Sequence, residues 1–182
     1  MNKVNNASYK TTLVIGASRL KQVLWYFINI ILVQNPLLPV SGIKLFFLRL
    51  FGAEIGKGVV IKPGVKIKFP WKLMIGENSW IGEGVWIDNL DIITIGKSVC
   101  ISQGAYLFTG NHDFKKSTFN LITHPILIED GVWIGALAIV CPGVTCGTHA
   151  VLTVASMATK NLQPYSIYKG NPAIKTSDRI IS

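Results

Sequence analysis

Aliphatic side chains recur every six residues along most of this chain after residue 55. In nearly every unit, a small or β-branched residue stands two positions before the periodic one. A helix repeats every 3.6 residues and a long strand every two, so neither explains this pattern. It predicts a short strand followed by a turn, with both marked side chains pointing inward. The periodic positions are Ile55, Ile61, Ile67, Ile75, Ile81, Ile87, Ile95, Ile101, Leu107, Ile128, Ile134, Val140, Cys146, Leu152 and Ala158.

Three such units close into a triangular coil, and successive coils stack at about 4.8 Å, the spacing of hydrogen-bonded strands. The sequence therefore predicts an all-β fold, a parallel β-helix of about five coils. The alternative, a β-sandwich whose spacing is coincidental, does not account for a period that persists over about a hundred residues. We expect this domain to span residues 51–173, after an N-terminal cap (1–50) and before a C-terminal tail (174–182).

The period lengthens at three places, and each follows the third unit of a coil. The surplus residues must therefore leave the same edge of the prism, one above another. They are the segments 69–72, 88–92 and an extended loop at 108–127. The long loop carries His112 and His124, and loops of this length within compact repeats are usually functional. Stacking places Asp88 and Asn89 one coil away from the root of this loop.

The first 50 residues lack the period and contain two apolar runs flanked by Arg19, Lys21, Lys44 and Arg49. We expect partly helical segments that cover the open edge of the first coil. The alternative is that they contact a membrane surface as peripheral amphipathic helices. The apolar run 23–33 has 11 residues, which is too short to cross a bilayer. No secretory signal peptide is evident, so we expect a cytoplasmic protein, located at the inner face of the membrane if these helices bind lipid.

The charge and the cysteine content argue against several classes of function. Lys and Arg number 18 against nine acids, for a net charge of +9, which favours anionic partners. No nucleic-acid-binding motif accompanies this charge, so no nucleic acid partner is expected. Cys100, Cys141 and Cys146 form no CxxC pair, which argues against a disulfide framework or a zinc cluster.

The stretch from Ile55 to Ala173 resembles the hexapeptide-repeat acyltransferases, most clearly at GNHDF, IEDGVWIGA, PGV and TK…GNPA. Within that group, the segments LFGAEIGKGVVI and ITIGKSVCISQGAYLFTGNHDF are most similar to colanic-acid-type O-acetyltransferases, near the galactoside and maltose acetyltransferases. The resemblance implies a left-handed β-helix and a homotrimer with active sites in the grooves between neighbouring prisms. It also implies acetyl-CoA as co-substrate, no metal, and a sugar or lipid-linked saccharide as acceptor.

The resemblance also assigns roles to residues of this chain. His112 matches the catalytic histidine, and Ala136 matches a position whose backbone N–H serves the oxyanion and lies beside the cofactor. The other matches are Asp88, Asn89 and Trp133 on the acceptor side, and Ala155, Thr159 and Lys160 on the coenzyme A side. The chain departs from the usual GAGS turn with Thr153-Val154-Ala155-Ser156, and it has Ile174 where an arginine is common.

These assignments make chemical sense for acetyl transfer to a hydroxyl. An alcohol is a poor nucleophile at neutral pH, and a histidine can remove its proton as it attacks a thioester. A rigid backbone N–H stabilises the resulting oxyanion without reorganisation. The predicted function is thus acetyl transfer to a sugar hydroxyl in exopolysaccharide or capsule biosynthesis, by direct attack with His112 as general base.

The sequence leaves two alternative functions. A γ-type carbonic anhydrase shares the fold but needs three histidines, two of them close in sequence, to bind zinc. His112, His124 and His149 do not repeat that spacing. The other alternative is a non-catalytic β-helix that serves as an assembly module; it predicts neither a histidine loop nor a pocket tryptophan. Trp80 and Trp86 point outward in the pattern and are expected at a subunit interface.

Overall fold

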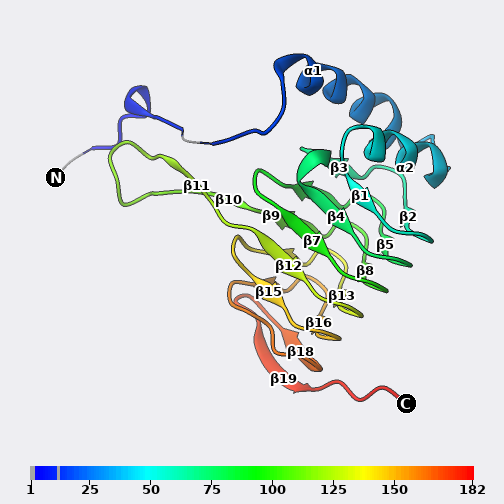
Figure 1. Cartoon of the computed structure of the whole chain (residues 1–182). Coiled ribbons are helices and arrows are strands. Elements are labelled where there is room, and N and C mark those ends of the chain that lie inside the picture. Colours follow the sequence, from blue (N-terminus) through cyan, green and yellow to red (C-terminus); the bar gives the residue numbers. More distant parts are fainter. Residues whose placement is uncertain (1–2, 12) are drawn as a thin grey trace.

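The computed structural model describes residues 3–11 and 13–182, and its main body is a triangular prism of three parallel sheets (Figure 1). Sheet A contains β1 (Glu54–Ile55), β4 (Leu73–Ile75), β7 (Ile93–Ile95), β12 (Ile126–Ile128) and β15 (Thr145–Cys146). Sheet B contains β2 (Val60–Ile61), β5 (Trp80–Ile81), β8 (Cys100–Ile101), β13 (Trp133–Ile134), β16 (Val151–Leu152), β18 (Ser166–Lys169) and β19 (Ile174–Asp178). Sheet C contains β3 (Lys66–Ile67), β6 (Trp86–Asp88), β9 (Tyr106–Phe108), β14 (Ile139–Val140) and β17 (Met157–Ala158). The predicted β-helix is confirmed, with five complete coils and part of a sixth.

The strand register explains the period of six residues. Ile61 pairs with Ile81, Ile81 with Ile101, and Ile101 with Ile134. The same periodic position is therefore stacked in register from each coil to the next. All four side chains are completely buried and form one column of the core. Because neighbouring residues of a strand point to opposite faces, the residue before each periodic position faces outward. Trp80 and Trp133 therefore lie on the outer face of sheet B, with 58% and 47% of their surface exposed.

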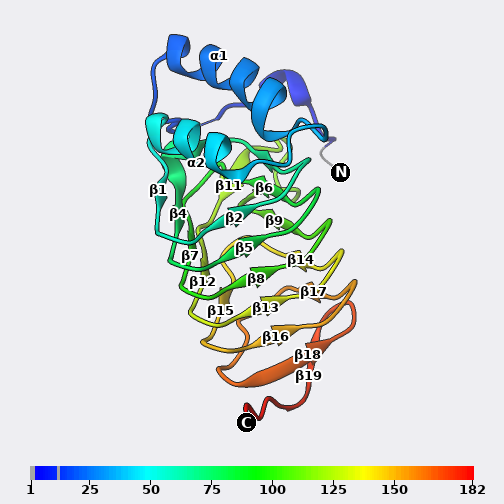
Figure 2. The same ribbon diagram turned by 90° about the vertical axis from the view of Figure 1, so that its right-hand side faces the viewer.

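The N-terminal helices cover the first coil, at the end of the prism opposite the C-terminus (Figure 2). They are α1 (Arg19–Ile28), a π-helical continuation η2 (Asn29–Val33) and α2 (Ser41–Leu50). The side chains of Trp25 and Asn29 both donate hydrogen bonds to the Ile67 carbonyl, at 3.0 and 2.9 Å. The Lys44 ammonium donates to the Lys62 carbonyl at 3.0 Å. These bonds satisfy carbonyls of the first coil that have no strand above them.

The other end of the prism is closed by the antiparallel pair β18–β19. Residues 174–178, which we expected to belong to a tail, form the last strand instead. In the described part of the chain, no helix is both long enough and apolar enough to cross a membrane.

Candidate active site

The long insertion after β9 forms an arm that projects from the prism (Figure 1). It is a two-stranded antiparallel hairpin of β10 (Gly110–His112) and β11 (Leu121–Thr123). The arm leaves the prism at the edge between sheets C and A, where the sequence predicted all three surplus segments to emerge. It therefore presents His112 away from the core, on a paired strand rather than on an irregular loop.

The ring of His112 is held in one orientation. It stacks on the ring of Phe119 with a centroid distance of 4.3 Å and an interplanar angle of 4°. Its Nδ1 lies 2.8 Å from the carbonyl oxygen of Phe119. A carbonyl oxygen only accepts hydrogen bonds, so in the neutral ring Nδ1 carries the proton and Nε2 keeps its lone pair. This arrangement leaves Nε2 as the proton-accepting atom of a partly exposed side chain.

The root of the arm is fixed by a group of polar contacts with the coil beneath it. The buried Thr109 hydroxyl donates to the Asp88 carbonyl at 3.1 Å and accepts from the Asp91 backbone N–H at 2.9 Å. The Thr123 hydroxyl donates to the Asp91 carboxylate at 3.1 Å. Both strands of the arm are thus tied to one short segment, which limits how far His112 can move.

The N-terminal segment also contacts the arm, which the sequence did not indicate. The Asn5 N–H donates to the Ser117 carbonyl at 2.9 Å, and the Lys10 N–H donates to the Asn120 side chain at 3.2 Å. The ring of Tyr9 lies 6.1 Å from the ring of His112. Residues far apart in sequence therefore meet at the tip of the arm, beside the candidate base.

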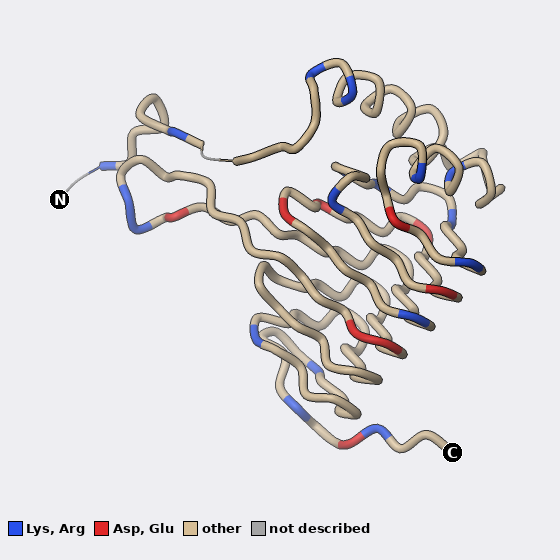
Figure 3. The backbone as a smooth tube through the Cα atoms, viewed as in Figure 1, with Lys and Arg blue, Asp and Glu red and all other residues tan. Residues whose placement is uncertain are grey.

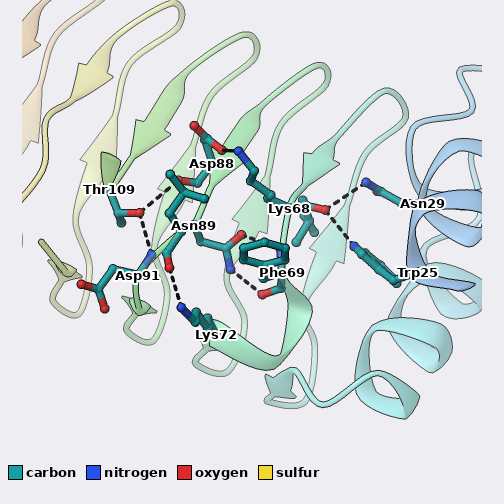
Figure 4. A network of polar contacts seen from close by, with 11 residues as sticks. Trp25, Asn29, Lys68, Phe69, Lys72, Asp88, Asn89, Asp91 and Thr109 are labelled. Atoms are coloured by element: carbon teal, nitrogen blue, oxygen red, sulfur yellow. Dashed lines mark hydrogen bonds and ion pairs between the residues drawn. The ribbon is translucent and has the colours of Figure 1, made fainter. Parts of the chain in front are cut away.

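Asp88 and Asn89 lie in a polar network one coil from the arm (Figure 4), as the stacking predicted. The partly buried Asp88 carboxylate pairs with the Lys68 ammonium at 2.9 Å. Asn89 is fully buried, and its amide bonds both the N–H and the carbonyl of Phe69, at 3.0 and 2.6 Å. The Lys72 ammonium donates to the Leu90 carbonyl at 2.6 Å, and burial lowers its pKa against the opposing effect of Asp91.

An aromatic ladder lies beside Asp88 on the outer face of sheet C. Trp86 stacks on Tyr106 with a centroid distance of 4.8 Å, and Tyr106 lies 5.1 Å from Phe108. Burial raises the pKa of the Tyr106 hydroxyl, and the Asp88 charge raises it further. Of these three aromatic residues, only Trp86 was expected at a functional surface from the sequence. Tyr106 and Phe108 could also have been found from the sequence, because both flank the periodic Leu107 and therefore point outward.

Two of the residues expected on the coenzyme side, Ala136 and Ala155, lie at a different edge from the arm. Ala136 and Ala155 occupy turns between sheets B and C in successive coils, and the Ala155 N–H donates to the Ala136 carbonyl at 2.8 Å. Trp133 lies on the strand before the Ala136 turn, and its indole N–H donates to the Ser102 hydroxyl at 2.9 Å. Thr159 and Lys160 are exposed and follow β17, at the edge between sheets C and A, which also carries the arm. One chain alone does not bring His112 and Ala136 to the same edge.

Comparisons with known proteins show which enzymes this chain resembles. No protein-family model matches the sequence. The chain is 38% identical over 165 residues to a protein of Escherichia coli (strain K12) named as a colanic acid biosynthesis acetyltransferase, WcaF, and the match covers 91% of each. It is 30% identical over 124 residues to the galactoside O-acetyltransferase of the same strain, covering 66% of this chain and 61% of the relative. These relatives define the class as acetyltransferases.

Solved structures share the fold. A hexapeptide-repeat acetyltransferase of Vibrio cholerae, complexed with acetyl coenzyme A, superposes with a TM-score of 0.80 at 23% identity, covering 91% of this chain and 92% of the other. A maltose O-acetyltransferase of Clostridium difficile 630 gives a TM-score of 0.76 at 20% identity, covering 90% of each. The chain belongs to the hexapeptide-repeat acetyltransferases. The predicted family and the predicted enzyme class, an acyltransferase, are confirmed.

Proposed function

We propose that this protein transfers an acetyl group from acetyl-CoA to a hydroxyl of a sugar or lipid-linked saccharide during polysaccharide biosynthesis. The similarity to the colanic acid relative over 91% of each chain supports this acceptor class. The acetyl-CoA complex of the Vibrio cholerae structure supports the donor. The observation that carries the proposal is the orientation of His112, because the Phe119 carbonyl leaves Nε2 free to accept a proton.

In the proposed reaction, His112 Nε2 removes the proton of the acceptor hydroxyl as its oxygen attacks the thioester carbonyl carbon. The carbonyl π electrons move to oxygen, and the backbone N–H of Ala136 stabilises this oxyanion. The tetrahedral species then collapses, the carbon–sulfur bond breaks, and the proton on Nε2 passes to the leaving thiolate. The products are an acetyl ester and free coenzyme A, and no acyl group is attached to the enzyme.

The proposed acceptor site lies beside Asp88 and the aromatic ladder of Trp86, Tyr106 and Phe108. Flat aromatic faces with a neighbouring carboxylate suit the apolar faces and hydroxyls of a sugar. Asn89 would act indirectly, because both of its polar groups are taken by the backbone of Phe69. Trp133 would line the pocket, and Ala155, Thr159 and Lys160 would hold coenzyme A, with the Lys160 ammonium near a phosphate.

The proposed assembly is a homotrimer with a site between each pair of prisms. The support is the separation of His112 and Ala136 onto different edges of one chain, so that a complete site needs a neighbouring copy. The outer faces of sheets B and C and the turn between them also expose large apolar side chains, among them Trp80, Trp86 and Leu137. Apolar surface of this kind is typical of subunit interfaces.

The function is tested by measuring thiol release from acetyl-CoA with the full chain and a panel of mono- and oligosaccharides, with mass spectrometry of the products. The expected result is thiol release that depends on an acceptor and a product heavier by one acetyl ester. Light scattering should give the mass of a trimer. Release that is equal with and without acceptors, or transfer only to amines, would contradict O-acetylation of a sugar.

A further inference from the structure

The N-terminal helices carry a second apolar stripe that faces away from the prism. On α1 and η2, Trp25 and Val33 face the first coil and are buried. At 3.6 residues per turn, the opposite side of the same helix is lined by another apolar set. Its members are Leu20 (70% exposed), Val23 (53%), Leu24 (48%), Phe27 (56%) and Ile31 (58%).

The second helix repeats this arrangement. Lys44 and Leu48 face the prism and are fully buried, whereas Ile43, Phe46 and Leu50 are 42%, 61% and 63% exposed. Because α2 packs against η2 and both helices cover the same end of the prism, the two stripes belong to one end of the molecule (Figures 1 and 2). We call this surface the outer apolar face. A water-soluble protein rarely leaves so many large apolar side chains together without a partner.

The charged residues of α1, η2 and α2 are all basic: Arg19, Lys21 and Arg49, together with Lys44, which is buried against the prism. No Asp or Glu precedes Glu54, so these helices carry no acidic side chain. Figure 3 shows the basic positions at the start of α1 and along α2. Arg19 and Lys21 occupy the first turn of α1, where a cation opposes the helix dipole and does not stabilise the helix. The helix dipole therefore does not account for the basic residues at this end of α1, and the Lys21 ammonium lies 5.1 Å from the centroid of the Trp71 ring.

We propose that the outer apolar face docks the enzyme onto an anionic lipid bilayer, with α1 and α2 lying in the plane of the headgroups. Apolar side chains with cations at their margins and no acids match the boundary between acyl chains and negative headgroups. A second copy of the same face would bring like charges together, which disfavours that partner. The proposal goes beyond the acetyl transfer described above and does not depend on it.

Co-sedimentation of the full chain with vesicles tests this proposal. One vesicle is phosphatidylcholine alone and the other is an equimolar mixture with phosphatidylglycerol, each at low and high salt. The outer-face variant is Phe27→Gln with Phe46→Gln, and the matched control is Ile180→Gln with Ile181→Gln, which changes two exposed aliphatic residues at the far end. Thermal melting, thiol release and light scattering are measured on all three proteins.

The wild type and the control should bind the mixed vesicles, more weakly at high salt, and should bind pure phosphatidylcholine poorly. The outer-face variant should bind the mixed vesicles at least tenfold more weakly, with melting temperature and thiol release unchanged. The proposal is wrong if the wild type sediments with neither vesicle, or if the control loses as much binding as the variant. A smaller mass for the variant in solution would also overturn it, because the face would then cover a neighbouring subunit.

Discussion

Replacement of Gly76 by alanine tests how tightly the coils stack. Gly76 donates its N–H to the Ile95 carbonyl at 2.7 Å, so its coil is bonded directly to the next. A Cβ at this position would lie 2.5 Å from the carbonyl carbon of Gly96 and 2.7 Å from the backbone nitrogen of Lys97. An ordinary contact between such atoms is about 3.5 Å, so the coils would have to separate by roughly an ångström.

The expected loss of stability is large because the atoms that the new Cβ would meet belong to the backbone. Overpacking of a tight interior costs about 1–3 kcal/mol, and backbone atoms that cannot rotate away place Gly76→Ala at the upper end. A domain of this size loses about 2–4 °C of melting temperature for each kcal/mol, so we expect a fall of about 6–12 °C. The edge between sheets A and B carries neither the arm nor Ala136, so thiol release at low temperature should persist.

The assay is thermal unfolding followed by circular dichroism, with Gly42→Ala as the matched control. A Cβ at Gly42, in α2, would meet no atom within 4 Å, so this change should be neutral or stabilising by up to about 1 kcal/mol. If Gly76→Ala melts at or above the wild-type temperature while Gly42→Ala behaves as expected, the argument from coil spacing is refuted.

Three further predictions concern the arm and the core. Asp91→Ala removes the hydrogen bond that the Thr123 hydroxyl donates, which costs about 1 kcal/mol in holding the arm. We expect kcat to fall about fivefold while KM for acetyl-CoA stays unchanged. Steady-state kinetics equal to those of the wild type would contradict this. Tyr9→Ala should also lower kcat, because the Tyr9 ring lies beside the His112 ring, while the melting temperature stays at the wild-type value. The control is Tyr26→Ala on the helical cap, and an equal loss of kcat in this control would show that the effect is non-specific. Burial, with a smaller effect of Glu129, raises the pKa of Cys146 from 9.0 to about 12. Because the folded state then disfavours the thiolate, its contribution to stability is complete below about pH 9 and falls by about 1.4 kcal/mol per pH unit above it. Urea unfolding should therefore show wild type losing stability relative to Cys146→Val as pH rises, and parallel curves would refute the shift.

Most of the fold could be predicted because the pattern that specifies each coil lies within a short stretch of sequence. Each coil is defined by side chains six positions apart, and the register of Ile81 on Ile101 repeats that spacing in three dimensions. The breaks in the period also fixed the edge from which the arm emerges, and hence the position of Asp88 beneath its root.

The remaining features depend on contacts that no local pattern records. Nothing near Asn5 indicates that its N–H meets the Ser117 carbonyl, because the two are joined only through the folded prism. The hairpin within the arm was also missed, since β10 and β11 are short and lack a hydrophobic alternation. The bonds of Asn89 to Phe69 depend on the course of the neighbouring coil, which a period cannot specify.

The comparison of His112→Ala with His124→Ala in acceptor-dependent thiol release tests the central proposal most directly. Both histidines belong to the long insertion, but only the ring of His112 is oriented by the Phe119 carbonyl. We predict that His112→Ala loses about 10²–10⁴-fold in kcat while it still binds acetyl-CoA, and that His124→Ala keeps a rate close to wild type. Equal turnover by His112→Ala and wild type would contradict the assignment of His112 as the general base.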